Sequence, residues 1–132
     1  MRTLLDTSVV IGAGVQPIDG ELAISAITLA ELHFGVLVAK DRKVRAERLR
    51  RLLVLQRTFD ALPVDEAVAA AYGQVAAAVV DVGRRPRARS MDLLIAATAM
   101  AHSARLCTHN VDDFVGLGEL LEVVPAPLVN GE

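Results

Sequence analysis

The sequence predicts an α/β fold: one domain with a short, mostly parallel sheet of about five strands flanked by helices. Short apolar runs of strand type alternate with longer segments whose apolar residues have helical spacing. The 132 residues are 53% hydrophobic, which is enough to fill one core. No repeat or low-complexity linker divides the chain, so we expect residues 1–132 to form a single domain.

Each predicted strand is a short apolar run that ends at a polar residue or a proline. The predicted strands cover residues 3–5, 22–24, 59–62, 105–108 and 122–124. Helices are predicted over residues 28–39, 42–57, 65–82 and 90–103. Because strands and helices alternate, the sheet should be mostly parallel and covered on both faces.

The charge and cysteine content exclude several classes of protein. A net charge of -2 argues against a protein that coats nucleic acid through bulk electrostatics. Cys107 is the single cysteine, so an intramolecular disulfide and a cysteine-rich zinc site are both excluded, and a reducing, cytoplasmic setting fits. The apolar stretches are interrupted by polar residues, so we expect neither a signal peptide nor a membrane span.

Acidic residues follow two of the predicted strands. Asp6 ends the first apolar run, and a buried carboxylate is costly unless it is paired, hydrogen-bonded or bound to a cation. The segment THNVDDF follows the strand at 105–108 and contains Asp112 and Asp113. Ligands of parallel α/β sheets bind at the carboxyl ends of the strands. We therefore expect Asp6 and either Asp112 or Asp113 to meet at one edge.

Two further acids, Glu31 and Asp92, are predicted in the first turns of helices on the same side of the sheet. Each acid has an ordinary explanation: Thr28 and Glu31 match a capping box, and Asp92 suits the helix dipole. Asp6 could likewise cap a short helix, and the acids of THNVDDF could form an Asx-turn. Jointly these explanations weaken, because carboxylates ~4 Å apart repel by about 4 kcal/mol per pair at a dielectric of ~20.

The donor set indicates which cation would offset that repulsion. Carboxylate oxygens without paired histidine or cysteine ligands favour Mg²⁺ or Mn²⁺. These ions serve displacement at phosphorus, so the sequence favours a phosphodiesterase or nuclease.

Three segments resemble the PIN-domain ribonucleases, in particular the VapC toxins of bacterial toxin-antitoxin pairs. The segments are LLDTSVVI, SAITLAELHFGV and MDLLIAATAMAHSARLCTHNVDDF, which occur in this order and at suitable separations. The resemblance implies a small α/β domain and an Mg²⁺- or Mn²⁺-dependent endoribonuclease acting on RNA. It also implies a homodimer and inhibition by a cognate VapB-like antitoxin.

The resemblance implies roles for individual residues. Asp6, Glu31 and Asp92 match the acids of the family, and Asp113 is the preferred fourth acid, with Asp112 as its neighbour. The small polar residues expected to support these acids are Ser8, Thr108 and Asn110. We hypothesise that Asp6 and Asp92 hold the principal metal ion, while Glu31 and Asp113 complete the site or hold a second ion. A metal-activated water would attack the phosphate, and no protein nucleophile is needed. His109 departs from the family pattern, in which arginine is frequent.

Two basic segments are candidates for contact with phosphate. The loop GRRPRAR leads to Asp92, and its four arginines are expected to bind RNA: Arg84, Arg85, Arg87 and Arg89. The arginine-rich helix at 42–57 either binds RNA phosphates or an acidic antitoxin segment, or is simply a solvated face with an i,i+4 pair between Glu47 and Arg51. Six apolar residues of this region could form a surface for dimerisation or antitoxin binding, but core packing is the default expectation for them: Phe34, Leu37, Leu49, Leu52, Leu53 and Phe59.

Two other classes of protein remain open. A receiver-type domain also binds Mg²⁺ with acids, but it needs a lysine near a late strand, and the lysines here are Lys40 and Lys43. A non-enzymatic binding module derived from the nuclease fold would not need all four acids, and a metal titration would distinguish it.

Overall fold

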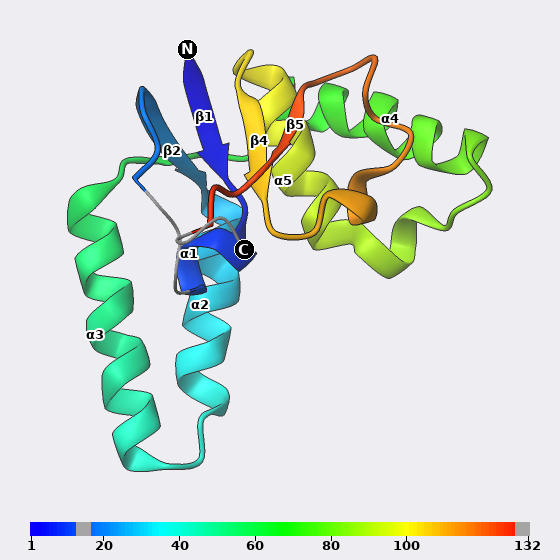
Figure 1. The fold of residues 1–132 in the computed structure, drawn as a ribbon. Helices are drawn as coiled ribbons and strands as arrows, with labels where there is room; N and C mark the ends of the chain where they lie inside the picture. Colours follow the sequence, from blue (N-terminus) through cyan, green and yellow to red (C-terminus); the bar gives the residue numbers. More distant parts are fainter. Residues whose placement is uncertain (13–16, 129–132) are drawn as a thin grey trace.

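A computed structural model describes residues 1–12 and 17–128 and contains a five-stranded sheet in the order β3-β2-β1-β4-β5 (Figure 1). Every neighbouring pair of strands is parallel. The strands are β1 (Arg2–Leu5), β2 (Glu21–Ser25), β3 (Ala61–Leu62), β4 (Arg105–Thr108) and β5 (Val123–Pro125). The predicted parallel α/β sheet is therefore confirmed.

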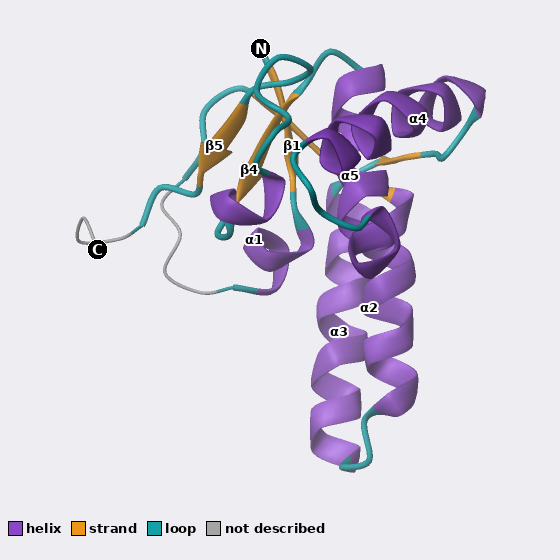
Figure 2. Cartoon of the chain, turned by 90° about the vertical axis from the view of Figure 1, so that its right-hand side faces the viewer, coloured by secondary structure: helices purple, strands orange, loops and turns teal. Residues whose placement is uncertain are grey.

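Five α-helices and two 3₁₀ turns connect the strands in the described residues. The helices are α1 (Thr7–Ile11), α2 (Ala26–Val38), α3 (Arg42–Thr58), α4 (Glu66–Asp81) and α5 (Ser90–Ala101). The 3₁₀ turns are η1 (Pro86–Arg89) and η2 (Val111–Phe114), and the sequence pattern did not predict them. Helices α2 and α3 lie side by side and project together from the rest of the molecule (Figure 2).

Alternating side chains of the central strands supply two apolar clusters. Leu4 and Leu106 pack with α4 and α5, while Leu5 and Cys107 join a smaller cluster with Val9 of α1. This alternation follows from the period of two residues along a strand. Helix α5 lies in the larger cluster, so the first turn of this helix is anchored firmly at the carboxyl edge of the sheet.

The start of α2 corrects one expectation from the sequence. Ser25, not Thr28, is the N-cap residue, and its hydroxyl accepts a hydrogen bond from the Ile27 N–H at 3.0 Å. Helix α2 thus begins at Ala26, and Glu31 lies beyond the first turn. Helix α5 differs in a similar way, because Arg89 occupies the N-cap position expected for Ser90.

The α2–α3 pair also corrects the expected core. Of the six apolar residues expected in the core, Leu52 is buried and Phe59 is partly buried, but the other four are exposed. These are Phe34, Leu37, Leu49 and Leu53. They are exposed because the pair extends beyond the sheet, which leaves the outer helix faces without a layer to pack against. No helix in the described residues is both long and apolar enough to cross a membrane.

Candidate active site

Asp6 lies where the two central strands end. The Asp6 N–H donates to the Cys107 carbonyl at 2.9 Å, which continues the β1–β4 pairing by one residue and brings Asp6 beside Thr108. The side chain is only 5% exposed. Although Asp6 occupies the N-cap position of α1, its carboxylate makes no capping hydrogen bond. The ordinary explanation, a helix cap, therefore does not account for this buried acid.

Two hydroxyl groups hold the Asp6 carboxylate. Thr108 Oγ1 donates to Asp6 Oδ2 at 2.7 Å, and Ser8 Oγ donates to the same oxygen at 2.9 Å. The hydroxyl oxygens themselves accept from backbone N–H groups, that of Asn110 at 3.0 Å for Thr108 and that of His109 at 3.2 Å for Ser8. These backbone donors direct both hydroxyl protons toward Asp6. Among the described residues, no side chain donates to Asp6 Oδ1.

Glu31 reaches the site from the second turn of α2. Its Oε1 accepts a hydrogen bond from Thr7 Oγ1 at 2.7 Å, and Thr7 Oγ1 is also 2.9 Å from Thr28 Oγ1. Thr28 therefore supports the site through α1 rather than capping α2. Thr7 is a contact that sequence reasoning missed. Its position directly after Asp6 was the available signal, because a residue at the start of α1 faces the neighbouring helix α2.

The pKa of Asp92 depends on partial burial and on the other three acids of the site. Partial burial in the first turn of α5 raises the pKa of its carboxyl group, and the negative charges of Asp6, Glu31 and Asp113 raise this pKa further. Arg89 opposes these effects and lowers the same pKa. Acids from four separate segments are therefore close enough for their charges to interact. The sequence-based convergence of Asp6, Glu31, Asp92 and Asp113 agrees with this electrostatic coupling.

Asp113 is held differently, because it already has a cation beside it. Arg89 Nη1 forms an ion pair with Asp113 Oδ1 at 2.8 Å and also donates to the Asp113 carbonyl at 3.3 Å. The hydrogen bond to the Asp113 carboxylate is the main cause that raises the pKa of the Arg89 guanidinium, and the negative charge of Asp113 raises this pKa further. The neighbouring Asp112 is exposed, and its carbonyl accepts a hydrogen bond from Arg84 Nη1 at 3.1 Å.

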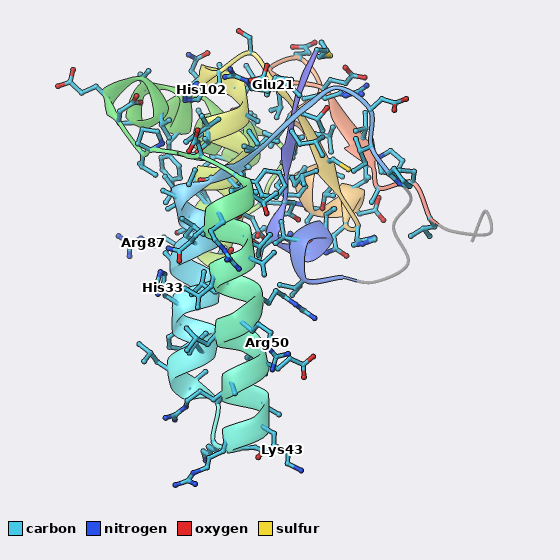
Figure 3. The ribbon with its side chains drawn as sticks, turned by 90° about the vertical axis from the view of Figure 1, so that its left-hand side faces the viewer. Glu21, His33, Lys43, Arg50, Arg87 and His102 are labelled. Atoms are coloured by element: carbon cyan, nitrogen blue, oxygen red, sulfur yellow. The ribbon has the colours of Figure 1, made fainter. Side chains whose placement is uncertain are left out.

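The four arginines of the basic loop divide into two pairs. Arg84, in the loop before η1, and Arg89, at the end of η1, both bind η2 through the contacts just described. Arg85 and Arg87 are exposed, and Figure 3 shows Arg87 at the surface of the molecule. Asn110 is exposed as well, and its backbone rather than its amide contacts the site. The ion pair of Arg89 with a site acid was not foreseen from the sequence.

The arginine-rich helix α3 also differs from expectation. In the described part of the chain, Glu47 and Arg51 form no ion pair. Arg51 instead donates from Nη1 to the Ile11 carbonyl at 3.2 Å, and Arg48 donates from Nη1 to the Gly35 carbonyl at 2.7 Å. These arginines therefore reach across to α1 and α2, and the prediction of a simple i,i+4 pair was wrong for Glu47 and Arg51.

The acids of the described residues do not form a ready-made metal cage. Across residues 1–12 and 17–128, no three acidic, histidine or cysteine side chains are grouped closely enough to hold a metal ion by themselves. Mg²⁺ usually keeps several waters and is bound through one or two carboxylates. Spaced oxygen donors at a partly hydrated site are therefore compatible with that ion.

Comparison with known proteins places the chain in a family. The PIN-domain family model matches residues 3–119. Ribonuclease VapC8 of Mycobacterium tuberculosis is 39% identical over 100 residues, which cover 73% of this chain and 88% of that protein. Ribonuclease VapC5 of the same species is 37% identical over 120 residues, or 86% of each chain.

The solved structures agree with the sequence comparisons. The structure of VapBC-5 from Mycobacterium tuberculosis, described as a member of the VapBC family of toxin-antitoxin systems, superposes with a TM-score of 0.81 at 33% identity. The match covers 96% of this chain and 98% of that one. The fold, the arrangement of acids and these similarities together show that the chain belongs to the PIN-domain family and groups within it with the VapC ribonucleases.

Proposed function

We propose that the chain is the toxin of a type II toxin-antitoxin pair and acts as a metal-dependent endoribonuclease, with Asp6, Glu31, Asp92 and Asp113 at its catalytic site. The observation that carries the proposal is the convergence of acids around Asp92, whose pKa is raised first by partial burial and then by the charges of Asp6, Glu31 and Asp113. Acids in such proximity repel one another, so their arrangement favours a bound cation. Similarity to ribonucleases VapC8 and VapC5 supports RNA as the substrate.

The donor set fits Mg²⁺ or Mn²⁺. The candidate ligands are carboxylate oxygens, and hydroxyl groups support them, while the single cysteine, Cys107, is buried in the smaller apolar cluster. Hard divalent cations prefer such oxygen ligands. Asp6 Oδ1 and the Asp92 carboxylate are proposed as the principal ligands, with Glu31 and Asp113 completing the site or holding a second ion.

The hydroxyl groups around the site would hold the carboxylates of Asp6 and Glu31 in fixed orientations. When bound, the cation supplies a water of lowered pKa and offsets the charge that develops on the phosphate. Ser8 and Thr108 fix Asp6 Oδ2, while Oδ1 accepts from no other side chain of residues 1–12 and 17–128. Thr7 fixes one oxygen of Glu31 in the same way. Preorganised ligands lose little conformational freedom when the reaction complex forms.

The proposed partners are RNA and a VapB-like antitoxin. Arg85 and Arg87 are exposed beside η1 and are the members of the basic loop best placed to contact RNA phosphates. The structural neighbour VapBC-5 is a toxin-antitoxin system, which supports an antitoxin for this chain. We also propose a homodimer, for which the exposed apolar side chains on α2 and α3 are candidate contacts.

The direct test is cleavage of total cellular RNA by the purified protein with Mg²⁺, Mn²⁺ or a chelator. We expect discrete fragments that require metal and disappear in Asp92→Asn, a nearly isosteric variant without the charge. Asp112→Asn is the matched control, because Asp112 is a neighbouring acid with an exposed side chain, and it should cleave almost as well as the parent. Full metal-dependent activity in Asp92→Asn would remove Asp92 from the proposed site.

A further inference from the structure

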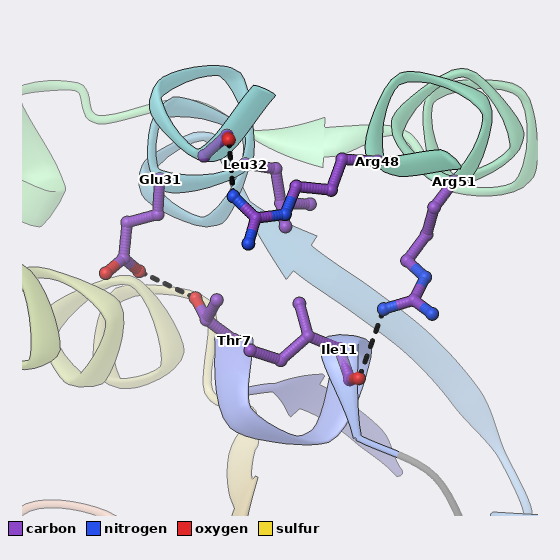
Figure 4. A pocket seen from close by; sticks show the side chains of 7 residues that line it. Thr7, Ile11, Glu31, Leu32, Arg48 and Arg51 are labelled. Carbon is purple, nitrogen blue, oxygen red and sulfur yellow. Dashed lines mark hydrogen bonds between the residues drawn. The ribbon is translucent and has the colours of Figure 1, made fainter. Parts of the chain in front are cut away.

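A cavity of about 420 Å³ lies between α1, α2 and α3, next to the acidic site. Glu31 and Thr7 form one wall and Arg48 and Arg51 form the opposite wall, as Figure 4 shows. Glu31 belongs to both places, because it lines this cavity and also raises the pKa of Asp92. The cavity is therefore a continuation of the acidic site toward the arginine-rich helix.

The two arginines have unused capacity to bind an anion. Within the described residues, each donates one hydrogen bond, Arg48 to the Gly35 carbonyl and Arg51 to the Ile11 carbonyl. A guanidinium group has five N–H donors, so most of these donors remain available. In the same residues neither group forms an ion pair, and no acid neutralises either charge at close range.

Gly35 lines the α2 side of the cavity, where the space is open. A Cβ atom built at Gly35 would meet no atom within 4 Å, so packing does not require glycine there. Glycine within a helix also costs about 0.5–1 kcal/mol relative to alanine. The open wall leaves the space in front of Arg48 free.

We propose that this cavity is a phosphate-binding subsite, in which Arg48 and Arg51 hold a backbone phosphate of the RNA strand next to the one that is cleaved. The inference rests on the proposed ribonuclease function and names the residues that position its substrate. A guanidinium group matches phosphate geometry and can bind it in a bidentate manner. The acids hold the cation at one end and the arginines bind the neighbouring phosphate at the other, which fixes the register of the strand without reading its bases.

Two kinds of variant test the subsite. The first is the double variant Arg48→Gln/Arg51→Gln, with Arg42→Gln/Arg50→Gln as the control. Both remove two charges from α3, but Arg42 and Arg50 do not line the cavity, and Figure 3 shows Arg50 on the surface of α3. The second is Gly35→Glu, which keeps both arginines and places a carboxylate before them. Its control is Gly73→Glu on α4, where a Cβ would also meet no atom within 4 Å.

The measurement is the fluorescence anisotropy of a fluorescein-labelled oligouridylate 12-mer RNA, with all variants made in the non-cleaving Asp92→Asn background and Mg²⁺ present. We expect the cavity variants to bind about tenfold more weakly, as the loss of charged hydrogen bonds implies. The slope of log affinity against log salt should fall by about 0.7 for each phosphate that the protein no longer binds. The two controls should change the dissociation constant by less than about threefold, and melting temperatures should confirm folding.

Four outcomes would overturn the subsite. Equal losses of affinity in the cavity variants and their controls would show general attraction to α3 rather than a subsite. Unchanged RNA binding in the cavity variants, together with weaker binding of the antitoxin, would assign the arginines to a protein partner. If the parent does not cleave RNA and the Asp92→Asn protein does not bind the probe, the ribonuclease function fails and the subsite with it. Cleavage by the parent with normal probe binding in every variant would reject the subsite alone.

Discussion

Asp6 and Asp113 follow neighbouring strands, yet the protein holds their carboxylates in opposite ways. Asp6 is 5% exposed and accepts hydrogen bonds from two neutral hydroxyl groups, whereas the side chain of Asp113 is 38% exposed and is paired with Arg89. Hydroxyl groups fix a carboxylate without neutralising it, but an arginine supplies the charge that a metal would otherwise supply. The Asp6 carboxylate is therefore free to bind a metal ion, whereas Asp113 can bind one only if it breaks or shares its ion pair with Arg89.

The largest expected effect is on RNA cleavage, when the negative charge of Asp6 or of Asp113 is removed. Asp6→Asn should reduce metal-dependent RNA cleavage by about a thousandfold or more, because it removes a proposed principal ligand. Asp113→Asn should cost about tenfold, since Arg89 already offsets its charge. Single-turnover cleavage rates of the two variants check the contrast. Equal losses would show that the ion pair does not separate the roles of the two acids.

The next effect concerns stability at the buried acid. Thr108→Val, which keeps the shape but removes the hydroxyl, takes a donor from Asp6 and an acceptor from the Asn110 N–H. We expect the free energy of unfolding to fall by about 1.5–3 kcal/mol, the range for a hydrogen bond to a charged group. Urea denaturation at neutral pH measures this change. A loss below about 0.5 kcal/mol would mean that water replaces the hydroxyl at this position.

The third prediction concerns the raised pKa of Asp92 and its effect on the stability of the fold. Its pKa is raised in the folded protein, so this group stabilises the fold below its unfolded pKa, and that contribution is lost as pH rises through the folded pKa. Without metal, Asp92→Asn should therefore melt a few degrees higher than the parent at pH 7, and the difference should disappear below about pH 4. Thermal scans across pH in chelator check this. A variant that melts lower at pH 7 would contradict the raised pKa, which partial burial and the three neighbouring acids cause.

The smallest effect is expected at the ion pair. Arg89→Ala should lower the free energy of unfolding by at most about 1 kcal/mol, because both side chains are partly exposed. Salt at about 1 M should abolish this difference through screening, whereas the Thr108→Val difference should persist. Urea denaturation at low and high salt makes the comparison. A loss that is unaffected by salt would indicate a packing role for the Arg89 side chain.

The sequence predicted the parallel sheet and the strand ends after which Asp6 and Asp113 follow. Strand alternation and the placement of Asp6 directly after β1 follow from local patterns, and so does Asp92 in the first turn of α5. Ser25 was missed as the cap of α2, because Thr28 and Glu31 also match a capping box and the pattern does not give the position of the strand end. The η1 and η2 turns are too short to show a period.

Contacts between distant residues were outside the reach of the sequence. The Arg89–Asp113 pair joins residues from different loops, and the carbonyl contacts of Arg48 and Arg51 depend on the packing of α3 against α1 and α2. The exposed leucines of α3 were predicted as core residues because helical spacing shows an apolar face but not whether another layer covers it.

Acids from four segments are proposed to form one cation site. Titration of the metal-free protein with Mn²⁺, followed by electron paramagnetic resonance of the free ion, tests this without requiring a known RNA target. We predict binding of Mn²⁺ by the parent, affinity lowered about 10- to 100-fold in both Asp6→Asn and Asp92→Asn, and no change in Asp112→Asn. Mn²⁺ binding that is the same in the parent, Asp6→Asn and Asp92→Asn would contradict the shared site.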